Sequence, residues 1–249
     1  MRGIVAAYRY YRYCFRWNPG ISENHSVIAL NKVQTVINGV DIRIPESYDK
    51  AEKRRSLGLS DDDFVLGTVN RFYPEKNIEM QIRLVHALAS EIPNLRLVVV
   101  AEHCGEYERI NALVRQLNIE NKVIFTGLRR DVPELLNIFD IFVMSSFSEG
   151  TSLALLEALS SGVVPVVSNV GGNSRIISHE DNGILFDVHD PESLKYHISE
   201  LYHNPEKRSC LALRAEEKRK KYGIADMVRA YAAIYDKLPG QRRNICGTV

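Results

Sequence analysis

The sequence feature that most restricts the fold of this chain is a regular alternation, from residue 64 onward, of short apolar runs with helical patterns. The apolar runs are rich in Val, Ile and Leu, which is typical of buried strands. Buried strands that alternate with helices indicate a parallel sheet covered by helices on both faces. We predict strands over 64–69, 95–100, 122–126, 140–144, 163–168 and 183–186. We predict helices between them over 78–91, 107–117, 132–138 and 152–160.

Sheets of this kind bind ligands in the loops at the carboxyl ends of their strands. We therefore expect function in the loops after Val69, Val100, Thr126, Met144 and Val167. Residues 191–237 are predicted to be helical, with Asp190 as the N-cap of a helix that begins at Pro191. The charge run over 214–221 is expected to be a solvated helix face.

The composition narrows the functional class. The 249 residues carry a formal net charge of +1, which gives no reason to expect a nucleic-acid partner. The four cysteines lie far apart without a CxxC pair, so we expect free thiols in a reducing compartment. No apolar run approaches the about 18 residues of a membrane span, and we see no signal peptide. We expect a cytoplasmic protein.

The loop after the first strand, residues 70–77, contains two cations, Arg71 and Lys76. Arg offers a planar fork for phosphate oxygens and Lys a point charge, so the two side chains can converge on one anion. Two unrelated surface charges are the ordinary interpretation of such a pair. The loop is a candidate phosphate site only if other groups meet it.

The loop after the fourth strand, residues 145–153, supplies such groups. Gly150 and its small neighbours allow close backbone approach, and the N-terminus of the next helix exposes N–H groups that suit a diphosphate. Glu149 precedes this helix and Glu157 lies within it, and carboxylates accept hydrogen bonds from sugar or ribose diols. Glu149 alone is also consistent with a simple helix cap. The glycine pair 171–172 follows the fifth strand, beside the same predicted site, although a plain turn would also explain it.

Two other features have competing interpretations. Residues 1–20 combine Arg with aromatic side chains on neighbouring faces of a predicted helix. Packing on protein is the ordinary interpretation of that helix; a peripheral contact with an anionic membrane and self-association are the alternatives. The acids at 61–63 superficially resemble metal ligands, but they directly precede a strand and are predicted to form a solvated turn.

Taken together, five segments resemble the C-terminal domain of retaining GT-B glycosyltransferases, the large family called family four. These segments are 36–41, 70–76, 125–128, 149–158 and 160–167. The resemblance implies an α/β fold: a Rossmann-like, doubly wound parallel sheet of about six strands with helices on both faces and a C-terminal helical tail. It divides the chain into 1–45, a remnant of an N-terminal domain with the interdomain segment, 46–240, the nucleotide-sugar-binding domain, and 241–249, a disordered tail.

The resemblance also assigns roles to matching residues. Arg71 and Lys76 would neutralise the diphosphate leaving group, Glu149 would contact the donor sugar, and Glu157 would bind the ribose hydroxyls. The backbone around Gly150, Thr151, Ser152 and Leu153 would hold the phosphates and sugar, and the backbone near Leu128 and Arg129 would read the base. The implied chemistry is hexosyl transfer with retention in polysaccharide biosynthesis, from a UDP- or GDP-sugar to a glycan or lipid-linked acceptor. It needs neither a metal nor a cofactor, and it would take place in the cytoplasm or at the inner face of the membrane.

The sequence departs from the family pattern in several places. Thr151 and Ser152 stand where Phe-Gly is common, Arg175 stands where an acid is usual, and the loop 101–105 lacks the usual glycine-rich turn. Family members also carry a second domain of similar size, so we expect a fragment or a natural remnant that binds donor without efficient transfer. The alternatives are a non-catalytic sugar-nucleotide-binding module and a sugar-nucleotide epimerase. An epimerase would need acid–base residues, for which His103 and His179 are the nearest candidates, although both are expected to be surface histidines.

Overall fold

The structure is a computed structural model, and it describes residues 34, 36–41 and 48–236. The predictions for the helix at 1–20 and for the tail at 241–249 lie outside these residues.

Within the described residues, six strands form one sheet in the order β3-β2-β1-β4-β5-β6, and every neighbouring pair is parallel. The strands are β1 (Phe64–Val69), β2 (Leu95–Val100), β3 (Val123–Phe125), β4 (Ile141–Met144), β5 (Val164–Ser168) and β6 (Ile184–Phe186). This order confirms the doubly wound parallel sheet. The chain reverses its direction of winding between β1 and β4, and the crevice outside such a reversal is where ligands bind in sheets of this class.

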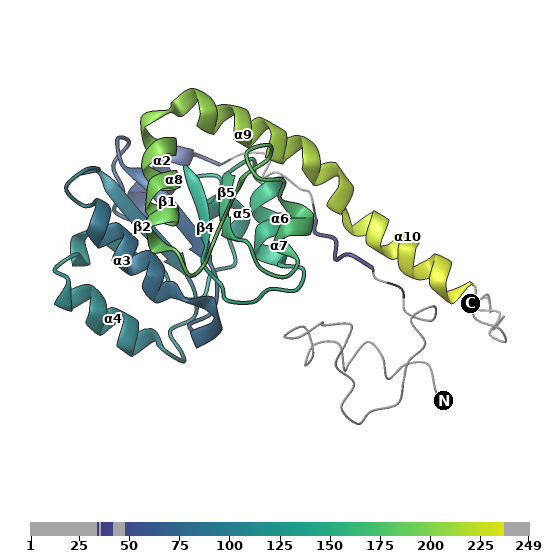
Figure 1. Ribbon diagram of the computed structural model, residues 1–249, viewed down its shortest axis with the longest axis horizontal. Coiled ribbons are helices and arrows are strands. Elements are labelled where there is room, and N and C mark those ends of the chain that lie inside the picture. The colour runs from purple at the N-terminus through teal and green to yellow at the C-terminus, as the bar shows by residue number, and fades with distance from the viewer. Residues whose placement is uncertain (1–33, 35, 42–47, 237–249) are drawn as a thin grey trace.

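Helices connect the strands and extend the C-terminal part (Figure 1). They are α2 (Lys50–Ser56), α3 (Ile78–Leu88), α4 (Tyr107–Gln116), α5 (Val132–Leu136), α6 (Leu153–Ser160), α7 (Asn173–Ile176), α8 (Pro191–His203), α9 (Pro205–Lys218) and α10 (Ile224–Tyr235). Short 3₁₀ helices are η2 (Pro74–Lys76), η3 (Glu120–Lys122) and η4 (Arg219–Tyr222). The predicted N-cap at Asp190 is confirmed, because its carboxylate accepts hydrogen bonds from the N–H groups of Glu192 and Ser193.

The core has two layers, one on each face of the sheet. Along β1, Phe64 and Leu66 pack into one layer with α3, α4 and α8, whereas Val65 packs into the other with α5, α6 and α7. Alternate residues of a strand point to opposite faces, so an apolar residue at every position is what a sheet covered on both sides requires. The continuous apolar runs of the sequence therefore have their explanation in this double coverage.

The predicted element bounds are confirmed to within a few residues, and β1 and β2 match at both ends. The sequence interpretation missed α2 and α7. Helix α2 is polar almost throughout, with Arg54 as its buried residue, and α7 has four residues, so neither shows an apolar stripe. The charge run at 214–221 covers the end of α9 and most of η4; Arg214, Glu217, Lys220 and Lys221 are exposed as expected, whereas Ala215 is buried.

The prediction that all three acids at 61–63 are solvated is wrong for Asp63. Its carboxylate is buried, where it accepts hydrogen bonds from the Ser60 N–H at 2.8 Å and from the Arg96 guanidinium at 3.1 Å. Arg96 belongs to β2, so the pairing of two strands decides which of three adjacent acids is buried.

The beginning of α10 is anchored to the segment that precedes α2. Val40 donates from its N–H to the carbonyl of Tyr222 at 2.9 Å, and its own carbonyl accepts from the N–H of Ile224 at 3.0 Å. Beyond that anchor, α10 projects away from the sheet (Figure 1).

Candidate active site at the carboxyl edge of the sheet

The loops after β1 and β4 meet across the crevice between these two strands. The N–H of Phe147 donates to the carbonyl of Glu75 at 2.9 Å, and the hydroxyl of Ser145 donates to the carbonyl of Asn77 at 2.8 Å. Two loops that lie far apart in the sequence are therefore joined at the place where this class of sheet binds ligands.

Lys76 and Glu149 form an ion pair at this junction. The Lys76 ammonium lies 2.8 Å from Oε1 of Glu149, and the two side chains are only 14% and 9% exposed. The hydroxyl of Ser146 donates to the same oxygen at 2.7 Å. Within the described residues Oε2 of Glu149 accepts no hydrogen bond, so one oxygen is held in place while the other keeps its capacity for a ligand.

The glycine pair after β5 packs directly on the loop that contains Glu149. Gly171 has a left-handed φ of +51°, and a Cβ there would lie 1.8 Å from the carbonyl oxygen of Glu149. The N–H of Gly172 donates to that carbonyl at 3.1 Å, and a Cβ on Gly172 would lie 1.9 Å from the carbonyl oxygen of Gly150. Any side chain would push the two loops apart, so the pair is more than a turn and supports the backbone on both sides of the Glu149–Gly150 peptide.

The N-terminus of α6 opens beside the same loop. Ser152 caps the helix, since its hydroxyl accepts from the N–H of Leu155 at 3.3 Å. The N–H groups of Thr151, Ser152 and Leu153 donate no hydrogen bond within the described part of the chain. Unpaired N–H groups at the positive end of a helix form a ready site for an anion such as a phosphate.

Glu157 lies on α6, largely withdrawn from solvent. Among the described residues its carboxylate has no hydrogen-bond or ion-pair partner. Burial raises the pKa of this carboxyl above its ordinary value. A half-buried acid that lacks a partner is poised to accept hydrogen bonds from ligand hydroxyls, which agrees with the role expected for it.

Other predicted site residues, all of them within the described ranges, make no hydrogen bond or ion pair with the side chains of Lys76 and Glu149. Arg71 is exposed, with its guanidinium 5.2 Å above the ring of Tyr73. Leu128 is 77% exposed in the loop after β3. The Arg129 side chain is held by Asp131 through hydrogen bonds of 2.8 and 2.6 Å, which raise the pKa of the guanidinium and lower that of the acid. Two of the three guanidinium nitrogens of Arg129 are therefore bonded to Asp131.

A chain of buried polar residues, Ser146, Ser168 and Asn173, holds Glu149 in place, and the sequence alone gave these three residues no role. Ser146 donates to Glu149, the Ser168 hydroxyl donates to the Ser146 carbonyl at 2.6 Å, and Asn173 donates to the Ser168 carbonyl at 3.0 Å. All three are buried. The available signal was small polar residues at the ends of two strands that are otherwise wholly apolar, namely β4 and β5.

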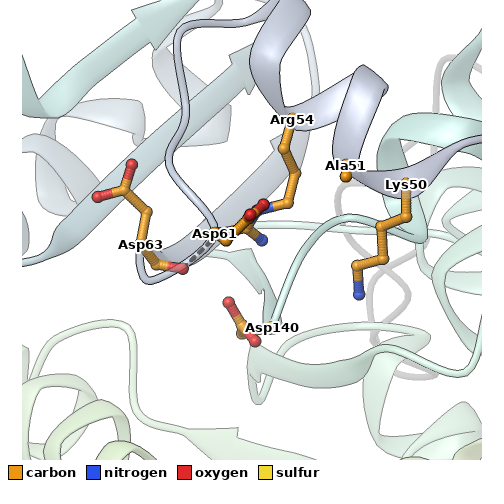
Figure 2. Close-up of a pocket in the computed structure, with 6 residues that line it drawn as sticks. All are labelled: Lys50, Ala51, Arg54, Asp61, Asp63 and Asp140. Atoms are coloured by element: carbon orange, nitrogen blue, oxygen red, sulfur yellow. Dashed lines mark hydrogen bonds between the residues drawn. The ribbon is translucent and has the colours of Figure 1, made fainter.

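A hollow of about 350 Å³ lies at the opposite, amino edge of the sheet. Figure 2 shows the side chains that line it: Lys50, Ala51, Arg54, Asp61, Asp63 and Asp140. Its buried charges are already used by the protein. Arg54 donates to the carbonyls of Ser60, Asp63 and Ile138, and Asp140 accepts from the N–H of Val65. We place the candidate site at the carboxyl edge, where the loops after β1 and β4 meet and the N-terminus of α6 opens beside Glu149.

Among the described residues, no helix is both long and apolar enough to cross a membrane. His103 and His179, the candidates for acid–base chemistry, are both exposed. His103 stacks on Tyr107, and Nδ1 of His179 accepts from the N–H of Leu185 at 3.1 Å.

Comparison with known proteins identifies the family of the chain. The family model "Glycosyl transferases group 1" matches residues 49–218. The chain is 29% identical over 217 residues to N-acetyl-alpha-D-glucosaminyl L-malate synthase of Bacillus anthracis, covering 86% of this chain and 56% of that protein. It is 32% identical over 170 residues to UDP-Gal:alpha-D-GlcNAc-diphosphoundecaprenol alpha-1,3-galactosyltransferase of Escherichia coli, covering 65% of this chain and 43% of that one. The chain thus spans about half the length of the curated relatives it matches.

Among solved structures, the fold is similar to that of HepE from Anabaena in complex with UDP-glucose. The TM-score is 0.76 at 23% identity, covering 82% of this chain and 57% of that one. The fold is also similar to the C-terminal domain of a glycosyl transferase group 1 family protein from Francisella tularensis. There the TM-score is 0.67 at 20% identity, covering 75% of this chain and all of that one. The match over residues 49–218 shows that the chain belongs to the family of glycosyl transferases group 1, and the doubly wound parallel sheet is consistent with it.

Proposed function

We propose that this chain is the donor-binding domain of a glycosyltransferase, which holds a nucleotide-diphosphate sugar for transfer to an acceptor with retention. The observation that carries the proposal is the Lys76–Glu149 pair beside the N-terminus of α6. A cation, an acid with a spare oxygen and a row of unpaired N–H groups are what a sugar diphosphate requires.

The roles follow from the charge that develops during transfer. When the bond between the sugar C1 and the diphosphate oxygen breaks, negative charge builds on the diphosphate, and Lys76, Arg71 and the α6 N-terminus stabilise it. Glu149 binds the sugar through its available oxygen, and Glu157 binds the ribose hydroxyls. Backbone groups near Leu128 and Arg129 meet the base. None of these roles requires a metal or a cofactor.

The finer assignments belong to the same proposal. The donor is a UDP- or GDP-hexose, and the acceptor is a glycan or lipid-linked sugar in polysaccharide biosynthesis. The reaction takes place in the cytoplasm or at the inner face of the membrane. The similar galactosyltransferase of Escherichia coli, which is named for UDP-Gal, and the similar fold of HepE, solved with UDP-glucose, support a sugar-nucleotide donor. Membership of a glycosyltransferase family speaks against the epimerase alternative.

Calorimetric titration tests the phosphate assignment. UDP, GDP and ADP are titrated into the wild-type chain, into Arg71→Ala/Lys76→Ala, and into the control Lys50→Ala/Arg55→Ala, which removes two exposed cations near the amino edge. Loss of two charge-assisted contacts should weaken binding about 100-fold or more. Equal binding by the wild type and the first variant would remove the phosphate assignment. A loss confined to the control would move the site to the amino-edge hollow.

Hydrolysis of UDP-glucose distinguishes a catalytic chain from the alternative, a non-catalytic binding module. A transferase that activates the C1–O bond should release glucose slowly in the absence of acceptor, and NMR of the first product gives its anomeric configuration. Release of α-glucose supports retention. Tight binding of the intact donor without any release supports the binding module instead.

A further inference from the structure

His103 and Tyr107 form a parallel ring stack beside the loop after β2. Their centroids lie 4.0 Å apart and their planes differ by 8°. His103 is exposed, and within the described residues it makes no hydrogen bond or ion pair. The imidazole therefore uses one face on Tyr107 and leaves the other to solvent.

Tyr107 is itself held firmly by aromatic neighbours. Its ring meets Phe72 edge-on at 5.3 Å and Phe125 edge-on at 5.4 Å, and both contacts come from elements of the sheet or its loops. Phe72 is buried. The stack rests on the apolar core, so the outer face of His103 keeps a defined orientation.

The stack lies next to the loop after β3. Gly127 has a left-handed φ of +69°, and a Cβ there would meet one atom of the described residues within 4 Å, Nε2 of His103, at 4.0 Å. Leu128 follows with its side chain exposed. An open backbone turn therefore stands beside an unused aromatic face.

The stack is also tied to the phosphate side of the site. The N–H of Glu106 donates to the carbonyl of Phe72 at 2.8 Å, which joins the loop after β2 to the loop that contains Arg71 and Lys76. Neighbouring strands lie about 4.8 Å apart, so β2 and β3 are within about 10 Å of β1. A nucleotide with its diphosphate at Lys76 can reach that far.

We propose that His103 is a platform on which the nucleobase of the bound donor stacks, while the backbone at Gly127 and Leu128 meets the edge of the base. This inference rests on the proposed donor-binding function and adds a residue that acts on affinity for the base. Stacking on an aromatic face tolerates any base, because every base has a π-face. His103 should therefore strengthen the binding of UDP and GDP alike and contribute nothing to pyrophosphate.

The experiment compares UDP, GDP and inorganic pyrophosphate by calorimetry with wild type, His103→Ala, His103→Tyr and the control His86→Ala, which removes an exposed histidine of α3. Base–aromatic stacking at a protein surface predicts about tenfold weaker UDP and GDP binding by His103→Ala. Pyrophosphate affinity should stay unchanged. His103→Tyr should restore nucleotide affinity to within about twofold of wild type, because a ring of similar orientation replaces the imidazole.

Three outcomes would overturn the platform. They are unchanged UDP and GDP binding by His103→Ala, an equal loss for pyrophosphate and nucleotides, and no recovery with His103→Tyr. All three require a wild-type chain that binds nucleotide, so they leave the proposed function standing. A wild-type chain that binds no nucleoside diphosphate would reject the donor-binding function itself.

Discussion

The two edges of the sheet use charged residues in opposite ways. At the amino edge, Arg54 donates to three backbone carbonyls, and Asp63 and one oxygen of Asp140 accept from the protein, so the buried charges of this hollow are bonded within the fold. At the carboxyl edge, Glu149 keeps one free oxygen among the described residues, and Glu157 keeps both.

This difference in bonding distinguishes charged groups that stabilise the fold from charged groups that are available to a ligand. Buried charges destabilise a fold unless they are paired, and at the amino edge the buried charges are paired within the protein. At the carboxyl edge some partly buried carboxylate oxygens have no partner among the described residues, and binding sites commonly lower the stability of the fold in this way. A hollow by itself is therefore a poor guide to function here, and unused bonding capacity is a better one.

Replacement of Arg54 should give the largest effect and should act on stability alone. Arg54→Met leaves the carbonyls of Ser60, Asp63 and Ile138 without this donor, and we expect the free energy of unfolding to fall by about 3–5 kcal/mol in urea denaturation. Arg55→Met, on the exposed side of α2, should change it by less than about 0.5 kcal/mol. If Arg54→Met keeps its stability but loses UDP affinity, the contrast between the edges is wrong.

Replacement of Glu157 should weaken binding and improve stability together. Glu157→Gln should bind UDP about tenfold more weakly, because a charge-assisted bond to ribose becomes a neutral one. Because burial raises the folded-state pKa of Glu157 above its reference value of 4.5, the wild type loses stability as pH rises through that folded pKa.

The variant should therefore be more stable than the wild type at pH 7, and the difference should shrink as the pH falls to the reference pKa of the acid and below. Urea denaturation across this pH range measures the difference. Glu217→Gln, an exposed change on α9, serves as the control and should show neither effect. A lower stability of Glu157→Gln at pH 7 would mean that the carboxylate has a structural role.

Replacement of Ser146 should give the smallest effect, and it distinguishes contacts with the sugar of the donor from contacts with the nucleotide. Ser146→Ala removes the bond to Oε1 of Glu149, which is worth about 1 kcal/mol, so UDP-glucose should bind about fivefold more weakly. UDP, which lacks the sugar, should bind as before. Ser148→Ala in the same loop is the matched control. An equal loss of affinity for UDP and UDP-glucose would contradict the proposed contact between Glu149 and the sugar.

Much of this molecule could be predicted from local pattern, and the exceptions share a cause. The strands Phe64–Val69 and Leu95–Val100 were predicted to the residue because a strand buried on both faces reads as a mostly apolar run. Helix α2 was missed because its buried residue is Arg54, whose partners lie in the turn before β1 and before β4. Asp63 was wrongly grouped with two solvated acids because Arg96 reaches it from the next strand.

The sequence by itself determined the parallel sheet, the edge at which sheets of this class bind ligands and the residue types that gather there, because each depends on periodicity or on a strand end. Only the tertiary structure decided that Lys76 meets Glu149, 73 residues away, and that Ser146 shares the same oxygen. That contact exists because β1 lies beside β4 in the sheet. Strand order is set by how two apolar layers close over both faces at once, which no local stretch of sequence records.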